Sequence, residues 1–110
     1  MNIEITQQAD ISIVTVTGKL DALTAPEYER RLGRLIEEGA QRIVVDFGPL
    51  VYVSSAGLRA LLNTTKPLQA RGGRIVYANL QEPVREVFEM TALLTLFRVH
   101  DSLADALADV

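Results

Sequence analysis

The sequence predicts an α/β fold, with a mixed β-sheet that begins as an N-terminal hairpin and continues as alternating helices and strands. Two segments rich in β-branched residues, joined by a short turn, open the chain and predict the hairpin. The continuous apolar run Ile43-Val44-Val45 is typical of a strand buried on both faces, as in a parallel sheet. Helical patterns separate the later strands, and strands joined through helices run parallel with right-handed crossovers.

The composition fits one small domain that spans residues 1–110. Of the 110 residues, 48% are hydrophobic, and the net charge of −3 without a basic stripe argues against nucleic acid as a direct partner. The absence of cysteine excludes disulfides and thiolate metal sites. The first residues lack a secretory signal, and no uncharged apolar run reaches the ~18–20 residues of a membrane span. We therefore expect a cytoplasmic protein without membrane insertion.

The first strand is predicted from alternation and the second from its β-branched residues. Ile3 and Ile5 alternate with polar residues, residues 7–10 form a turn, and residues 11–17 form the second strand. Gly18 to Leu23 is expected to be a loop.

The first helix is predicted to start at Thr24, where Thr24 and Glu27 match a capping box and Pro26 occupies the first turn. Gly39 is the expected stop. Its apolar stripe consists of Tyr28, Leu32, Leu35 and Ile36.

The central strand is predicted over residues 43–47, and Gly48-Pro49 ends it. A helix follows, with apolar residues at helical spacing: Leu58, Leu61, Leu62 and Leu68. Pro67 removes a helical hydrogen bond, so a kink or an early end is expected near residues 64–66.

The C-terminal part repeats the pattern. Gly72-Gly73 turns into a strand over residues 74–78, and Pro83 starts the next helix. A last strand is expected over residues 95–99. Asp101 or Ser102 then caps a final helix whose apolar face carries Leu103, Ala106, Leu107 and Val110.

Two adjacent serines, Ser54 and Ser55, stand between the central strand and its helix. Either hydroxyl could cap the helix by accepting a hydrogen bond from a free backbone N–H. The same helix N-terminus accommodates anions, so a phosphoryl group on a serine here would add about −1.5 to −2 charge without breaking the fold. The residues alone leave both interpretations open.

The segment Val53-Ser54-Ser55-Ala56-Gly57-Leu58-Arg59, after a strand that ends in Asp46, resembles the signature of STAS domains. It is similar in particular to bacterial anti-sigma-factor antagonists. The resemblance spans nearly the whole chain and implies the STAS fold, a βα superhelix. In that family a serine kinase, the anti-sigma factor, phosphorylates a serine at the start of this helix, which aligns with Ser55. The family often has an aspartate just before it, where this chain has Ser54.

The resemblance also implies a partner-binding surface. The segment from Gly18 to Pro26 resembles the family's kinase-contacting segment, and Asp21 matches an acidic position there, although it could also be a solvated loop residue. The implied partners are the anti-sigma kinase and a phosphatase acting on phosphorylated Ser55. The kinase would carry the nucleotide and Mg²⁺, so no cofactor is expected in this chain. The expected contact residues are Gly18, Asp21, Ser54, Ser55, Gly57 and Arg59.

The sequence offers little for catalysis, and we expect no enzyme. His100 is the only histidine, and Val53 rules out a Gly-x-Ser-x-Gly elbow around Ser55. Asp46 could hydrogen-bond loop amides or repel a phosphate, and the first role is favoured.

Two other functions remain open. Free-standing STAS domains similar to this one serve as cytoplasmic subunits of lipid-transport ATPases. A stand-alone nucleotide-binding domain is disfavoured, because Gly72-Gly73 does not open a helix as a phosphate loop would.

Overall fold

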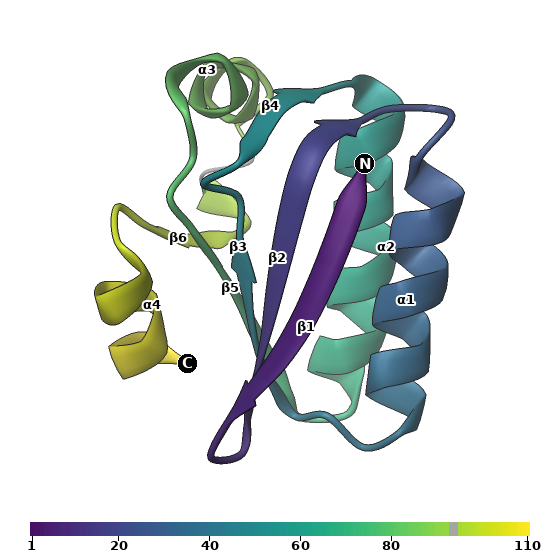
Figure 1. Ribbon diagram of the computed structural model, residues 1–110, viewed down its shortest axis with the longest axis vertical. Helices are drawn as coiled ribbons and strands as arrows, with labels where there is room; N and C mark the ends of the chain where they lie inside the picture. The colour runs from purple at the N-terminus through teal and green to yellow at the C-terminus, as the bar shows by residue number, and fades with distance from the viewer. Residues whose placement is uncertain (93–94) are drawn as a thin grey trace.

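A computed structural model describes residues 1–92 and 95–110 and contains a six-stranded mixed sheet (Figure 1). The strands hydrogen-bond in the order β1-β2-β3-β5-β6, while β4 pairs only with the end of β2. The elements follow in the order β1 (Asn2–Gln8), β2 (Ile11–Leu20), α1 (Ala25–Glu37), β3 (Arg42–Asp46), β4 (Leu50–Val53), α2 (Ser55–Ala70), β5 (Arg74–Ala78), α3 (Glu82–Met90), β6 (Arg98–His100) and α4 (Leu103–Asp109).

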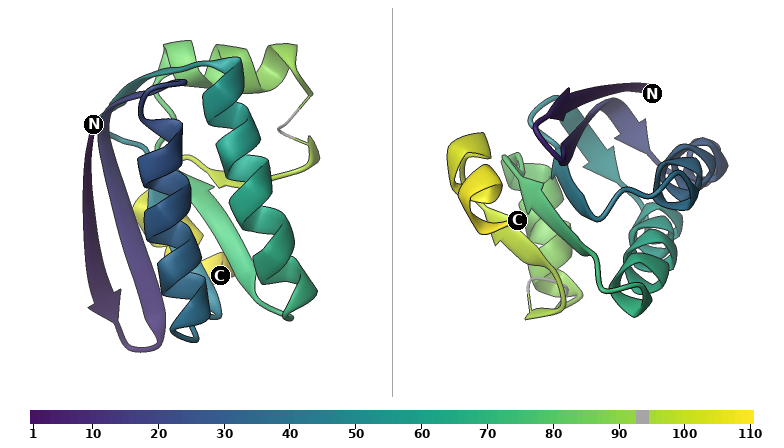
Figure 2. Two further views of the ribbon diagram at one scale, coloured as in Figure 1. Left: turned by 90° about the vertical axis from the view of Figure 1, so that its right-hand side faces the viewer. Right: turned by 90° about the horizontal axis from the view of Figure 1, so that it is seen from below.

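The sheet confirms the predicted hairpin and parallel strands. β1 and β2 pair antiparallel, whereas β2, β3, β5 and β6 run parallel to one another. α1 and α2 cover one face of the sheet, and the short α4 packs on the other face (Figure 2). Val44 and Val45 are both fully buried, as expected of a central strand, and they face the two opposite cores.

β2 is longer than the sequence predicted, because it continues through Gly18 to Leu20. Before Gly18 the strand pairs with β3; from Gly18 onward it pairs with β4, with a register shift between Gly18 and Lys19. Gly18 adopts φ 99°, a left-handed conformation that favours glycine. The prediction of a loop over Gly18–Leu23 was therefore wrong for its first half.

The sequence analysis missed β4. This strand has only four residues, and its two central side chains, Val51 and Tyr52, are exposed, so it lacks the pattern of a buried strand. Its pairing with β2 carries the chain from Gly48-Pro49 to the start of α2.

α2 does not end early at Pro67 but continues to Ala70. Pro67 cannot donate to the carbonyl of Asn63, one turn earlier. Both residues are exposed, so water can solvate that carbonyl and the helix tolerates the proline.

The last strand begins later than predicted, at Arg98 rather than Thr95. Phe97 is instead a buried aromatic side chain, with its ring centroid 5.1 Å from that of Tyr77 and 5.9 Å from that of Phe88. Ser102, one of the two predicted caps, begins α4 by accepting from the N–H of Asp105.

Candidate functional site

Ser54 is the N-cap residue of α2. Its Oγ accepts a hydrogen bond from the Gly57 N–H at 3.2 Å, and its own N–H donates to the Leu20 carbonyl at 3.0 Å. The capping alternative for Ser54 is thus confirmed, and its hydroxyl is engaged in holding the helix start.

Ser55 is the first residue of α2, and its side chain is exposed. Among the described residues, no hydrogen bond involves its hydroxyl. The first turn of α2 contains no acidic residue, so no carboxylate competes for the positive end of the helix dipole. The two serines therefore differ: one hydroxyl is used by the fold and the other faces solvent.

Gly57 allows the first turn of α2 to pack directly on the end of β2. A Cβ atom here would lie 2.5 Å from the Leu20 carbonyl oxygen and 2.9 Å from a methyl group of Val53. Together with the Ser54–Leu20 hydrogen bond, this contact brings the start of α2 beside the segment that follows Gly18. The segment after Gly18 and the start of α2, both predicted to form the partner-binding surface, therefore lie side by side at the end of the sheet where β2 stops (Figure 1).

Asp21 organises the connection between β2 and α1. Its Oδ1 accepts from the N–H groups of Leu23 and Thr24 at 3.0 and 3.2 Å. The Thr24 hydroxyl donates to the Lys19 carbonyl at 2.9 Å and accepts from the Asp21 N–H, so it makes no cap to α1. The predicted capping box was therefore wrong, because the loop uses the threonine instead.

Three exposed apolar side chains flank these segments, and the sequence analysis overlooked them. Leu23 in the β2–α1 connection is 90% exposed, and Val51 and Tyr52 on β4 are each 48% exposed. The signal in the sequence was an apolar residue, Leu23, inside a predicted loop, and two more, Val51 and Tyr52, shortly after the predicted break at Gly48-Pro49. Arg59 is also exposed and lies one turn after Ser55, on the same side of α2.

Asp46, at the end of β3, supports the turn into β4. Its Oδ1 accepts from the Gly48 N–H at 2.8 Å and from the Asn79 side-chain amide at 3.1 Å. The favoured sequence interpretation, a carboxylate that binds loop amides, is confirmed.

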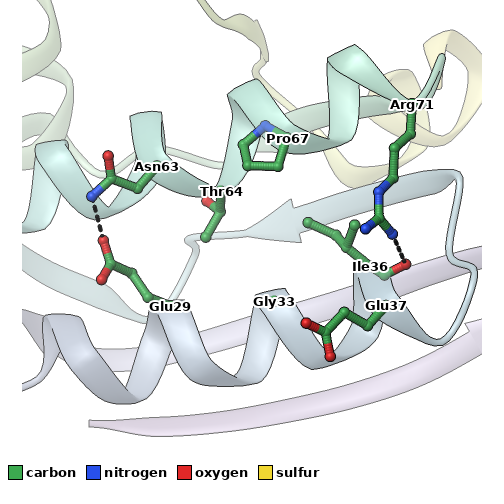
Figure 3. Close-up of a pocket in the computed structure, with 8 residues that line it drawn as sticks. All are labelled: Glu29, Gly33, Ile36, Glu37, Asn63, Thr64, Pro67 and Arg71. Atoms are coloured by element: carbon green, nitrogen blue, oxygen red, sulfur yellow. Dashed lines mark hydrogen bonds between the residues drawn. The ribbon is translucent and has the colours of Figure 1, made fainter.

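Other chemistry-bearing features lie elsewhere. His100 contacts the carboxylate of Asp109 at 2.9 Å, and the described residues contain no cluster of His, Cys, Asp and Glu that could hold a metal ion. A groove of about 290 Å³ separates α1 from α2 (Figure 3), and none of the predicted site residues lines it. Its walls carry Glu29, Gly33, Ile36, Glu37, Asn63, Thr64, Pro67 and Arg71.

Comparison with known proteins agrees with this architecture. The model of the STAS domain family matches residues 2–106. The chain belongs to the STAS domain family. It is 38% identical over 96 residues to the anti-sigma factor antagonist BtrV of Bordetella bronchiseptica, covering 87% of this chain and 83% of that one. It is 31% identical over 101 residues to the anti-sigma-B factor antagonist of Staphylococcus aureus, covering 92% and 94%.

Two solved structures match this chain over almost its whole length. An anti-sigma factor antagonist from Mycobacterium paratuberculosis matches with a TM-score of 0.90 and 26% identity, covering 99% of this chain and 92% of that one. The phosphorylated form of SpoIIAA, a Bacillus cell fate determinant, matches with a TM-score of 0.74 and 20% identity, covering 98% of each chain. In the parts of this chain that are described, no helix combines the length and apolarity needed to cross a bilayer.

Proposed function

We propose that this STAS domain is an anti-sigma factor antagonist that binds a serine-kinase anti-sigma factor and is released when that kinase phosphorylates Ser55. The observation that carries the proposal is the difference between the two serines. The Ser54 hydroxyl caps α2 by accepting a hydrogen bond from the Gly57 N–H. The Ser55 hydroxyl is exposed at the same helix start and free to react. The names of the relatives, anti-sigma factor antagonists, support this class of function.

The binding face consists of the end of β2, the β2–α1 connection and the first turns of α2. Its exposed apolar side chains, Leu23, Val51 and Tyr52, give the unmodified protein a surface to bury against the kinase. Gly18 and Asp21 set the path of the connection, and Gly57 holds it against α2. The face is an interaction surface rather than a catalytic site, and the protein acts in the cytoplasm, where the sigma factor is.

The modification is a phosphoryl transfer in which the kinase supplies ATP and Mg²⁺. The Ser55 oxygen bonds to the γ-phosphorus while the bond from that phosphorus to the bridging oxygen breaks, and ADP leaves. A base of the kinase takes the hydroxyl proton. A phosphatase later returns Ser55 to its free form by hydrolysis.

The switch works through the interface and not through the fold. A dianion at the N-terminus of α2 is favoured by the free N–H groups and the helix dipole, and Arg59 lies one turn away to screen it. In the complex, however, the same charge replaces a small hydroxyl in close contact with the partner. Desolvation and repulsion at that point release the kinase.

The test incubates the chain with its cognate kinase and ATP and locates the phosphate by mass spectrometry. Ser55→Ala should keep binding and take up no phosphate, whereas Ser54→Ala should still be phosphorylated. Because Ser54→Ala also removes the helix cap, it should lose about 0.5–2 kcal/mol of stability. Phosphate on Ser54 would contradict the assignment of Ser55. If no kinase modifies either serine, the role of a lipid-transport ATPase subunit becomes the better proposal.

A further inference from the structure

The outer edge of β1 is not paired with any other strand of the described chain. β1 lies at the end of the sheet, and no element of the described chain lies beyond it (left view of Figure 2). Its seven residues pair with β2 in continuous register from Asn2 to Gln8, without a bulge. The strand also contains no proline and no lysine, the residues that commonly block edge pairing.

The hairpin geometry identifies which backbone groups are free. The two-residue loop Ala9-Asp10 joins the strands, so the residues on either side of it form a hydrogen-bonded pair. Such pairs alternate along an antiparallel ladder, and the groups that point to the free edge belong to Ile3, Ile5 and Gln7. A hydrogen bond from the Arg31 guanidinium to the Ile3 carbonyl, at 3.5 Å, agrees with this orientation.

Arginines of α1 run along this edge. A groove of about 480 Å³ between β1 and α1 is lined by Ile5, Arg30, Arg31, Arg34, Leu35 and Glu38. Arg30 is held by Glu27 at 2.6 Å, but Arg31 and Arg34 reach their carboxylate neighbours only at 3.8 Å. The Arg34 side chain is 73% exposed. The groove thus combines two apolar side chains, Ile5 and Leu35, with two loosely paired cations.

We propose that this edge binds an extended acidic peptide segment of a partner protein, which adds a strand beside β1. The backbone of the segment would pair with Ile3, Ile5 and Gln7, and it would displace the Arg31 guanidinium from the Ile3 carbonyl. Because side chains alternate between faces of a strand, every second residue would project over the groove. Acidic residues at those positions would meet Arg31 and Arg34. This site is separate from Ser55, and its use does not depend on phosphorylation.

Charge favours a partner of this kind over a second copy of the chain. If two β1 edges paired antiparallel, each would bring its own Arg31 and Arg34 alongside the other's, and like charges repel. An acidic segment meets opposite charge instead, and its binding should weaken as salt rises.

The test uses the whole chain and a short synthetic peptide in which glutamate and threonine alternate. Binding is followed by fluorescence anisotropy at low salt, and amide hydrogen exchange by NMR. The peptide should bind and slow exchange at Ile3, Ile5 and Gln7, with little change at Glu4 and Thr6, whose amides already bond to β2. A matched peptide with every backbone nitrogen methylated keeps its glutamate charges but cannot donate to the ladder, so it should not protect these amides.

Arg34→Glu should weaken binding about two- to fivefold, the range expected for an exposed charge pair. The control Lys66→Glu makes the same change of charge at an exposed position of α2 and should bind as the unchanged chain does. The proposal is overturned if the glutamate peptide does not bind, if the N-methylated peptide binds equally well, or if protection appears elsewhere. Protection of the same amides without peptide, together with a dimer in sedimentation, would make a second copy the occupant instead.

Discussion

At the scale of single residues, two glycines in helices serve different purposes. Gly57 is required because a side chain would collide with the backbone of Leu20 at 2.5 Å, whereas a Cβ at Gly33 would meet nothing within 4 Å. Gly57→Ala should therefore lower the free energy of unfolding by about 1–3 kcal/mol through overpacking. Gly33→Ala should raise it by about 0.5–1 kcal/mol, because alanine suits a helix interior better. Urea unfolding of both variants measures these changes. If the two substitutions shifted the free energy of unfolding equally, the close contact of Gly57 with Leu20 would be contradicted.

Val44 illustrates a residue whose burial was predicted and found. Val44 belongs to β3, and its side chain is fully buried in the small core between the sheet and α4. Val44→Ala removes two methyl groups from this small core and should cost about 1–3 kcal/mol of stability. Val51→Ala, at a half-exposed position of β4, is the matched control and should change stability by less than about 0.5 kcal/mol. An unchanged unfolding midpoint for Val44→Ala would argue against a tightly packed central strand.

At the scale of elements, a strand is predictable from sequence when a local pattern marks it, and is missed when it depends on pairing with a segment distant in sequence. β3 was predictable, with bounds one residue out at each end, because burial on both faces leaves the uninterrupted apolar run Ile43-Val44-Val45. β4 was not, because its existence depends on the end of β2, which is distant in sequence and turns toward β4 only at Gly18. The continuation of α2 through Pro67 and the use of Thr24 within its loop likewise depend on solvent exposure and neighbouring backbone groups.

α4 packs on the sheet through Ala106, and Asp109 adds polar contacts with β6. Its carboxylate accepts from the Arg98 guanidinium at 2.8 Å and contacts His100 at 2.9 Å. The hydrogen bonds from Arg98 and then His100 hold the pKa of the Asp109 carboxyl well below its usual range. A carboxyl with a lowered folded-state pKa stabilises the fold above its unfolded pKa of about 3.9. That contribution disappears as the pH falls toward the folded-state value.

A pH series on Asp109→Asn tests this attachment. The variant should melt below the unchanged protein at neutral pH, since the ion pairs are lost. The difference in Tm should shrink as the pH drops below about 4, where the Asp109 carboxyl begins to protonate in the unfolded chain while it is still ionised in the folded protein. A constant difference across pH would assign the effect of Asp109 to packing alone.

At the scale of the whole molecule, the proposed binding face gathers segments that are far apart in the sequence. The sequence could predict Ser55, Gly57 and the segment after Gly18 as parts of the partner-binding surface, because each belongs to a local pattern. Without the family resemblance, the residues could not separate the roles of Ser54 and Ser55, which depend on where the first turn of α2 begins. Nor did the sequence reveal the exposed apolar side chains, whose exposure depends on the packing of β2 against β4.

Leu23 provides a test of that face, since it is 90% exposed and contributes little to the core. Leu23→Asp should leave the free energy of unfolding within about 0.5 kcal/mol of its original value. It should weaken binding of the cognate kinase about tenfold or more, because the apolar contact is replaced by a desolvated charge. Surface plasmon resonance with purified kinase measures the affinity, and an unchanged Kd would remove the β2–α1 connection from the interface.

The last prediction concerns the switch, which should alter the surface of the molecule and leave its architecture intact. Ser55→Glu places one negative charge at the first position of α2, where the helix dipole should stabilise it by about 0.3–1 kcal/mol. Ser55→Gln has nearly the same shape without the charge. Both variants should keep the circular dichroism spectrum of the unchanged protein, but Ser55→Glu should bind the kinase more weakly than Ser55→Gln. If the two variants bind equally, bulk rather than charge releases the partner, and if Ser55→Glu loses structure, phosphorylation acts by disturbing α2 itself.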